Sequence, residues 1–193
     1  MKLMFASDIH GSVSCCKKMI ERFKEENAGQ LILLGDLLYH GPRNPLPENY
    51  SPAETAELLN GISEYILCVR GNCEAEVDQM MLNFPVLADY AALFTEDGRT
   101  VYCTHGHLFK GENKLPIKRN SILIEGHSHI YTAEKREDHY YINTGSVTLP
   151  KNGNQKSYVI YENGRFSVRN MSGSELSWIN IQAPAANKNI TEI

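Results

Sequence analysis

Residues 30–36 read QLILLGD, an apolar run that ends at a glycine and an aspartate. An apolar run without polar alternation is typical of a strand that is covered on both faces. Two similar runs, Leu3–Ala6 and residues 65–72 (YILCVRGN), lie on either side of it in the sequence, and a helical apolar spacing from Cys15 to Phe23 follows the first. The first half of the chain is therefore predicted to alternate buried strands with helices.

Two more helices are expected in this half. Ser51 has the character of an N-cap, Pro52 suits the first helical position, and Glu54 stands three residues after the cap. Residues 74–81 also have a helical pattern, which Pro85 ends.

The second half is richer in strands. Residues 100–107, 121–129 and 139–145 are apolar runs with short links, and Asn163-Gly164 separates two alternating runs as in a hairpin. We expect an α/β fold of two packed sheets flanked by helices. A single domain over residues 1–182 is expected, with residues 183–193 as a flexible tail.

Composition excludes several classes of protein. The 193 residues are 42% hydrophobic and carry a net charge of −4, without the basic face that nucleic-acid binding requires. We expect no signal peptide and no membrane-spanning run. The five cysteines form no C-x-x-C pair, which argues against disulfides and a thiolate zinc site. These features predict a soluble, cytoplasmic protein with reduced thiols.

Each predicted strand is followed by side chains that can bind a metal ion. Residues two apart in an extended chain project to the same side, and ligands bind beyond the carboxyl ends of parallel strands. Each residue alone is more simply explained as a cap, a turn former or a surface residue, but their joint occurrence is not. The set is Asp8, His10, Asp36, Asn72, His105, His127 and His129.

The composition of this set predicts its chemistry. Histidine, carboxylate and amide ligands without a thiolate suit Mn²⁺, Fe²⁺, Zn²⁺, Co²⁺ or Ni²⁺. Seven ligands are too many for one open catalytic ion and fit two ions that share a carboxylate. Two such ions can hold a bridging hydroxide for in-line attack on a phosphoryl group. The predicted reaction is phosphoester hydrolysis.

Five motifs carry a family resemblance: DIH (8–10), GD (35–36), GNCE (71–74), THGH (104–107) and GHSH (126–129). In order and spacing they are similar to the calcineurin-like metallophosphoesterases, and among these to the YfcE-type bacterial phosphodiesterases. The resemblance extends to about residue 180. It implies a four-layer αββα sandwich, Mn²⁺ as the activating ion, a small phosphodiester substrate and a homo-oligomer.

The resemblance also implies how the ligands divide between the ions. Asp36 bridges two sets, of which one is Asp8, His10 and His129 and the other is Asn72, His105 and His127. His107 is expected beside the ligands or facing the substrate.

Cys73 stands where most of the family has a histidine that assists the leaving group. It has three interpretations: a substituted general acid, a packing thiol or a redox switch. Because a thiol donates a proton poorly at neutral pH, we expect diesters with good leaving groups as substrates and little monoesterase activity. His40 and Arg43 either contact the substrate phosphate or belong to a rigid surface loop.

Three other functions compete with a phosphodiesterase. A non-catalytic scaffold of the same fold would be expected to have lost ligands, and this chain keeps all seven. A two-metal amide hydrolase is disfavoured by the asparagine ligand, and a nuclease by the absence of a basic stripe.

Overall fold

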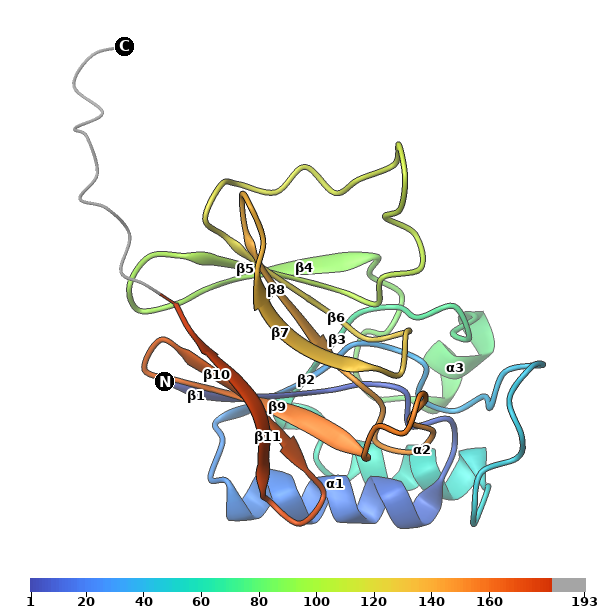
Figure 1. Cartoon of the computed structure of the whole chain (residues 1–193). Coiled ribbons are helices and arrows are strands. Elements are labelled where there is room, and N and C mark those ends of the chain that lie inside the picture. Colours follow the sequence, from blue (N-terminus) through green and yellow to red (C-terminus); the bar gives the residue numbers. More distant parts are fainter. Residues whose placement is uncertain (182–193) are drawn as a thin grey trace, which may run out of the picture.

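The computed structural model describes residues 1–181, which form two β-sheets packed face to face (Figure 1). The first sheet has the strand order β11-β10-β9-β1-β2-β3 and the second the order β4-β5-β6-β8-β7. The first consists of β1 (Lys2–Ala6), β2 (Gln30–Leu33), β3 (Ile66–Cys68), β9 (Ser157–Glu162), β10 (Arg165–Asn170) and β11 (Glu175–Asn180). The second consists of β4 (Tyr90–Phe94), β5 (Thr100–Thr104), β6 (Ile122–Glu125), β7 (Tyr131–Lys135) and β8 (Tyr140–Thr144).

Each sheet has a parallel centre with antiparallel neighbours. Strands β1, β2 and β3 run parallel, and so do β5, β6 and β8, whereas β9 and β4 pair antiparallel with β1 and β5. The expected α/β fold with two packed sheets is confirmed. The predicted ligands lie on the loops that follow β1, β2, β3, β5 and β6.

Strand β1 shows how the first sheet separates two cores. Leu3 and Phe5 point into the core between the two sheets, and Met4 and Ala6 point into the core beneath the helices. All four side chains are almost completely buried. This explains the uninterrupted apolar runs, because the central strands of this sheet are covered on both faces.

The helical cover lies on the first sheet. Helices α1 (Val13–Glu25) and α2 (Pro52–Asn60) pack against its outer face, below the sheets in Figure 1. The predicted cap is confirmed, since the Ser51 hydroxyl accepts a hydrogen bond from the Glu54 N–H at 3.4 Å. On the outer face of the second sheet, the loop of residues 106–117 lies over Leu123 and Tyr141.

Four elements differ from the prediction. Helix α3 (Glu76–Met81) begins two residues later than expected. The Glu74 carboxylate accepts hydrogen bonds from the loops after β2 and β3 instead of joining the helix. Asp78 caps the helix by accepting a hydrogen bond from the Ala75 N–H. Strands β4, β7 and β11 were not predicted. They form edges of the two sheets, and none of their side chains is fully buried.

The expected hairpin at Asn163-Gly164 joins β9 to β10, and both residues have positive φ angles, 50° and 75°. No helix in residues 1–181 is long and apolar enough to cross a membrane. The predicted tail of residues 183–193 lies outside the described residues.

Candidate metal centre

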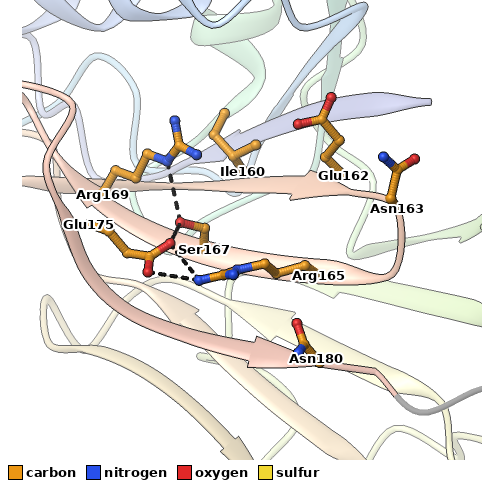
Figure 2. A pocket seen from close by; sticks show the side chains of 8 residues that line it. All are labelled: Ile160, Glu162, Asn163, Arg165, Ser167, Arg169, Glu175 and Asn180. Atoms are coloured by element: carbon orange, nitrogen blue, oxygen red, sulfur yellow. Dashed lines mark hydrogen bonds and ion pairs between the residues drawn. The ribbon is translucent and has the colours of Figure 1, made fainter.

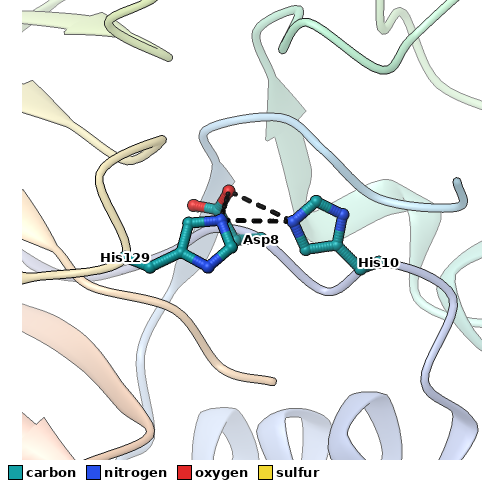
Figure 3. A group of neighbouring side chains, drawn as sticks. All are labelled: Asp8, His10 and His129. Carbon is teal, nitrogen blue, oxygen red and sulfur yellow. Dashed lines mark hydrogen bonds and ion pairs between the residues drawn. The ribbon is translucent and has the colours of Figure 1, made fainter. Parts of the chain in front are cut away.

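The predicted ligands of the first set come together from two loops. Asp8 and His10 follow β1, and His129 lies in the loop after β6. Figure 3 shows the Asp8 carboxylate next to the rings of His10 and His129. The Nε2 atoms of His10 and His129 lie 3.5 Å and 3.1 Å from Asp8 Oδ1 and 3.3 Å from each other. All three side chains are buried. These atoms are close enough together to hold one ion.

Asp36 connects this group to the predicted ligands of the second set. Its Oδ2 lies 3.8 Å from His10 Nε2, and its Oδ1 lies 3.4 Å from His105 Nε2. His105 Nε2 is also 3.3 Å from the Asn72 Oδ1. The His127 ring lies 5.0 Å from the His105 ring, centroid to centroid. The structure thus brings all seven predicted ligands into one cluster.

Three histidines in the cluster have their ring orientation fixed by backbone carbonyls. The Nδ1 atoms of His10, His105 and His129 contact the carbonyl oxygens of Tyr39, Leu34 and Leu149. Because a carbonyl oxygen can only accept, Nδ1 carries the proton in each ring and donates it. This directs Nε2 at the carboxylates, where it donates while it carries a proton and offers its lone pair to a metal ion once that proton is lost, as metal-binding histidines commonly do.

The two carboxylates are ionised. Burial opposes ionisation of Asp8, but the neighbouring His10 and His129 rings hold its pKa well below the usual value. Burial likewise opposes ionisation of Asp36, and the hydrogen bond from His105 lowers its pKa. No lysine or arginine pairs with either carboxylate in the described chain. Asp8 Oδ1 is buried and accepts no hydrogen bond there, so this cluster fits a cation.

Two histidines of the cluster have opposite proton affinities. Although burial lowers it, hydrogen bonding to Asp36 and the negative charge of Asp8 raise the pKa of His105 to about 9. Burial and the nearby His105 lower the pKa of His127 to about 4, so the His127 ring is neutral at pH 7. A neutral imidazole is the form that binds a metal ion.

Five of the seven ligands have left-handed backbone conformations. Such φ angles are uncommon for residues other than glycine, and here they let the chain turn sharply after a strand. The φ angles are 60° at Asp8, 51° at His10, 57° at Asp36, 63° at His127 and 60° at His129.

Two glycines let the ligand-bearing loops approach each other closely. A Cβ added at Gly71 would lie 2.2 Å from Asp36 Oδ1, and one added at Gly126 would lie 1.9 Å from Ser7 Oγ. Neither position has room for a side chain. The glycines in the GNCE and GHSH motifs are therefore required by packing around the ligands.

Glu74 joins two of these loops, a role that the sequence analysis did not find. Its buried carboxylate accepts hydrogen bonds from the backbone N–H groups of Asp36, Leu37 and Gly71 at 2.9, 2.7 and 2.5 Å. Burial and the neighbouring Asp36 raise the pKa of Glu74 to about 7, which opposes the effect of these donors. The only signal in the sequence was its place in the GNCE motif.

A pocket of about 310 Å³ opens onto the cluster. Its wall includes Asp36, His127 and His129 together with Arg43 and Cys73. His40 is not among the residues that line it: the His40 ring packs edge-on against Tyr50, with 5.2 Å between the ring centroids. The structure thus brings Arg43, but not His40, to the pocket.

Cys73 and His107 lie close to the ligands. The Cys73 N–H donates to Asp36 Oδ1 at 2.9 Å, and burial together with the Asp36 charge raises the pKa of the thiol. The thiol is therefore neutral at pH 7. The His107 ring lies 5.4 Å from the His105 ring, centroid to centroid, and its buried Nδ1 has no hydrogen-bond partner among the described residues.

A second hollow, of about 440 Å³, lies over β9, β10 and β11 and has a different character (Figure 2). Its charged side chains are all engaged in ion pairs: Arg165 donates to both oxygens of Glu175, at 2.8 and 3.0 Å, Arg169 pairs with Glu26 and Glu162 with Lys2. It has no histidine in its wall and lies on another part of the first sheet. We therefore place the functional site at the histidine and aspartate cluster.

A two-sheet α/β fold with a buried histidine and aspartate cluster at its strand ends defines a metal-dependent hydrolase. Residues 1–164 match the calcineurin-like phosphoesterase superfamily domain. The chain belongs to this superfamily.

Known relatives agree with this assignment. The chain is 48% identical over 168 residues to phosphodiesterase YfcE of Escherichia coli K12, covering 87% of this chain and 91% of that protein. A solved structure described as Yfce, a phosphoesterase from E. coli, has a TM-score of 0.90 at 44% identity and covers 94% of this chain and 100% of that one. Vps29 of Chaetomium thermophilum, at 16% identity and a TM-score of 0.63, shares the fold over 95% of this chain and 100% of its own.

We predict that Glu74→Gln loosens the loops that carry Asp36 and Asn72. An amide has a single acceptor oxygen and would direct its own N–H groups at backbone donors, so we expect a loss of about 1–3 kcal/mol of unfolding free energy. For a domain of this size, each kcal/mol lowers the melting temperature by roughly 2–4 °C. The melting temperature of metal-free protein measures this loss, at pH 8, where a Glu74 carboxyl with a pKa of about 7 is mostly ionised.

The matched control is Glu64→Gln, which removes the same charge from the exposed turn Ser63–Tyr65. Its melting temperature should equal that of the wild type. A Glu74→Gln variant that melts with the wild type would contradict the role assigned to this carboxylate.

Proposed function

We propose that the chain is a phosphodiesterase that uses two divalent metal ions, with Mn²⁺ as the activating ion. The observation that carries this proposal is the three Nε2 atoms directed at two ionised carboxylates, each ring fixed by a backbone carbonyl. Membership of the phosphoesterase superfamily and the name of the E. coli relative support the reaction class.

The two oxygens of Asp36 support a shared role. Oδ2 faces His10 and Oδ1 faces His105, so the carboxylate can serve both sides of the cluster. We assign it as the bridge between two ligand sets. Asp8, His10 and His129 form one set, and Asn72, His105 and His127 form the other.

Bound ions supply an activated water at neutral pH and stabilise the charge that develops on the phosphoryl oxygens. The chain itself holds and orients the phosphate. Arg43 lines the pocket and offers a two-pronged donor to the unesterified oxygens. We assign His40, which packs on Tyr50, to the support of this loop rather than to direct contact.

Cys73 limits the range of leaving groups in this proposal. Its neutral thiol lines the pocket beside Asp36, where an imidazolium would be able to protonate a departing alkoxide. Because a thiol is a weak donor, good leaving groups are favoured. A monoester dianion is a less favourable substrate than a diester with an aryl leaving group.

We also assign the protein to the cytoplasm. All five cysteines are free thiols, and four of them are buried. Free thiols are usual in a reducing compartment.

The proposed function predicts metal-dependent hydrolysis of bis-p-nitrophenyl phosphate. Metal-stripped protein should be inactive and should regain activity with Mn²⁺, while p-nitrophenyl phosphate is hydrolysed much more slowly. Asp36→Asn should lower kcat at least about 100-fold, since it would weaken the hold on both ions, and losing one group that stabilises transition-state charge already has an effect of this size. Release of p-nitrophenolate measures both reactions.

Asp89→Asn is the control, because Asp89 is exposed and pairs only with Arg70 in the described chain. It should retain wild-type activity. Binding of Mn²⁺ without hydrolysis of either ester would instead favour a non-catalytic scaffold.

The assignment of Cys73 predicts that Cys73→His broadens the range of leaving groups. An imidazole at this position can donate a proton, so turnover of a p-nitrophenyl monoester and of an alkyl-leaving diester should rise by about 10-fold or more. Turnover of bis-p-nitrophenyl phosphate, whose leaving group needs little assistance, should change much less. Cys73→Ser, which keeps a weak donor, is the matched control.

Equal loss with all substrates in Cys73→His would assign the residue to packing. In that case the general-acid interpretation fails.

A further inference from the structure

Lys151 lies at the mouth of the metal pocket and had no role in the sequence analysis. It lines the same pocket as Asp36, His127 and His129, on the wall formed by the loop after β8. Arg43 comes from the loop between β2 and α2. We propose that Lys151 binds a second phosphate group on the substrate, so that the preferred substrate is a phosphodiester with an additional phosphate on one arm. This inference rests on the proposed function.

The backbone of Lys151 is tied directly to a predicted ligand. Its N–H donates to the carbonyl of His129 at 3.0 Å, and its own carbonyl accepts from Asn154 at 3.0 Å. Two residues earlier, the Leu149 carbonyl accepts from the His129 ring. The segment that orients His129 therefore also sets the position from which the Lys151 side chain projects.

The loop before Lys151 is fixed to the same strand end. Ser146 Oγ donates to the Asp8 carbonyl at 2.9 Å and accepts from the Leu149 N–H at 2.8 Å, and Thr148 Oγ1 donates to the Ile9 carbonyl at 2.8 Å. Ser146 and Thr148 are both buried. The Lys151 side chain therefore starts from a fixed point on the wall of the pocket.

The charge of Lys151 is not neutralised by the protein. Neither Lys151 nor Arg43 forms an ion pair within residues 1–181, and both are exposed. The charged groups in the hollow over β9–β11 are, by contrast, all in ion pairs. A cation without a partner at the edge of a binding pocket is available to an anionic ligand.

The scissile diester does not need this second cation. A phosphodiester has a single negative charge, which in the proposed function is bound by the metal cluster and the Arg43 guanidinium. An additional phosphate on one arm would bring the charge that Lys151 can bind, by a charge-assisted hydrogen bond. Lys151 is therefore a specificity-determining residue, and its effect belongs in KM.

Two chromogenic diesters that differ by one phosphate test this proposal. Thymidine 5′-(p-nitrophenyl phosphate) has a free 3′-hydroxyl, and its 3′-phosphorylated form has the second anion. With Mn²⁺-loaded wild type we expect a KM roughly fivefold to tenfold lower for the phosphorylated form. A single charged hydrogen bond that is partly screened by solvent has an effect of this size. Lys151→Gln should abolish this difference, with kcat within twofold of wild type, and Lys151→Arg should keep it.

Lys24→Gln is the matched control, because it removes the same charge from the exposed side of α1. Binding of thymidine 3′,5′-bisphosphate, measured by calorimetry, should weaken in Lys151→Gln and not in the control. Equal KM values for the two diesters in the wild type would overturn the inference alone. An equal change for both diesters in Lys151→Gln would also overturn it, because Lys151 would then act only through His129. Hydrolysis of neither diester would overturn the proposed function as well.

Discussion

The site depends on a backbone conformation that most residues avoid. Five of the predicted ligands have φ angles between 51° and 63°, a region that costs an ordinary residue about 1–2 kcal/mol. Hydrogen bonds between the loops after β1 and β2 offset this cost. The Asp8 and His10 N–H groups donate to the carbonyls of Gly35 and Asp36 at 3.1 and 2.9 Å. The sharp turns send the ligands into one buried volume instead of along the strand direction.

The same loops concentrate negative charge where the protein offers little to balance it. Asp8 and Asp36 are buried, and the described chain provides only imidazoles and backbone or hydroxyl donors beside them. Burying two carboxylates with only imidazoles for partners is costly, even with the raised pKa of His105. A bound divalent ion relieves this cost, so metal binding should stabilise the fold as well as supply chemistry. The Glu74 carboxylate, held by three backbone N–H groups, keeps the loops of Asp36 and Asn72 together.

The sequence predicted the centre of the fold better than its edges. Buried strands such as β2 have continuous apolar runs, and the ligands are found directly after them, so both could be predicted. Strand β7 has the half-polar sequence YTAEK, and β4, YAALF, is apolar but has at its centre two alanines, which do not favour strands. The left-handed ligands could not be predicted, because no glycine marks those positions. Glu74 and Lys151 were missed for another reason: their roles depend on backbone contacts with residues distant in sequence or across a turn.

The central claim is that one cluster holds two ions that share Asp36. Anomalous diffraction from crystals of the Mn²⁺-loaded protein tests it most directly, since each bound manganese gives a peak of its own. The account predicts two peaks about 3.5–4 Å apart, as in two-metal hydrolases, with Asp36 between them. One peak at full occupancy, or two peaks with Asp36 bound to neither or to only one, would contradict it.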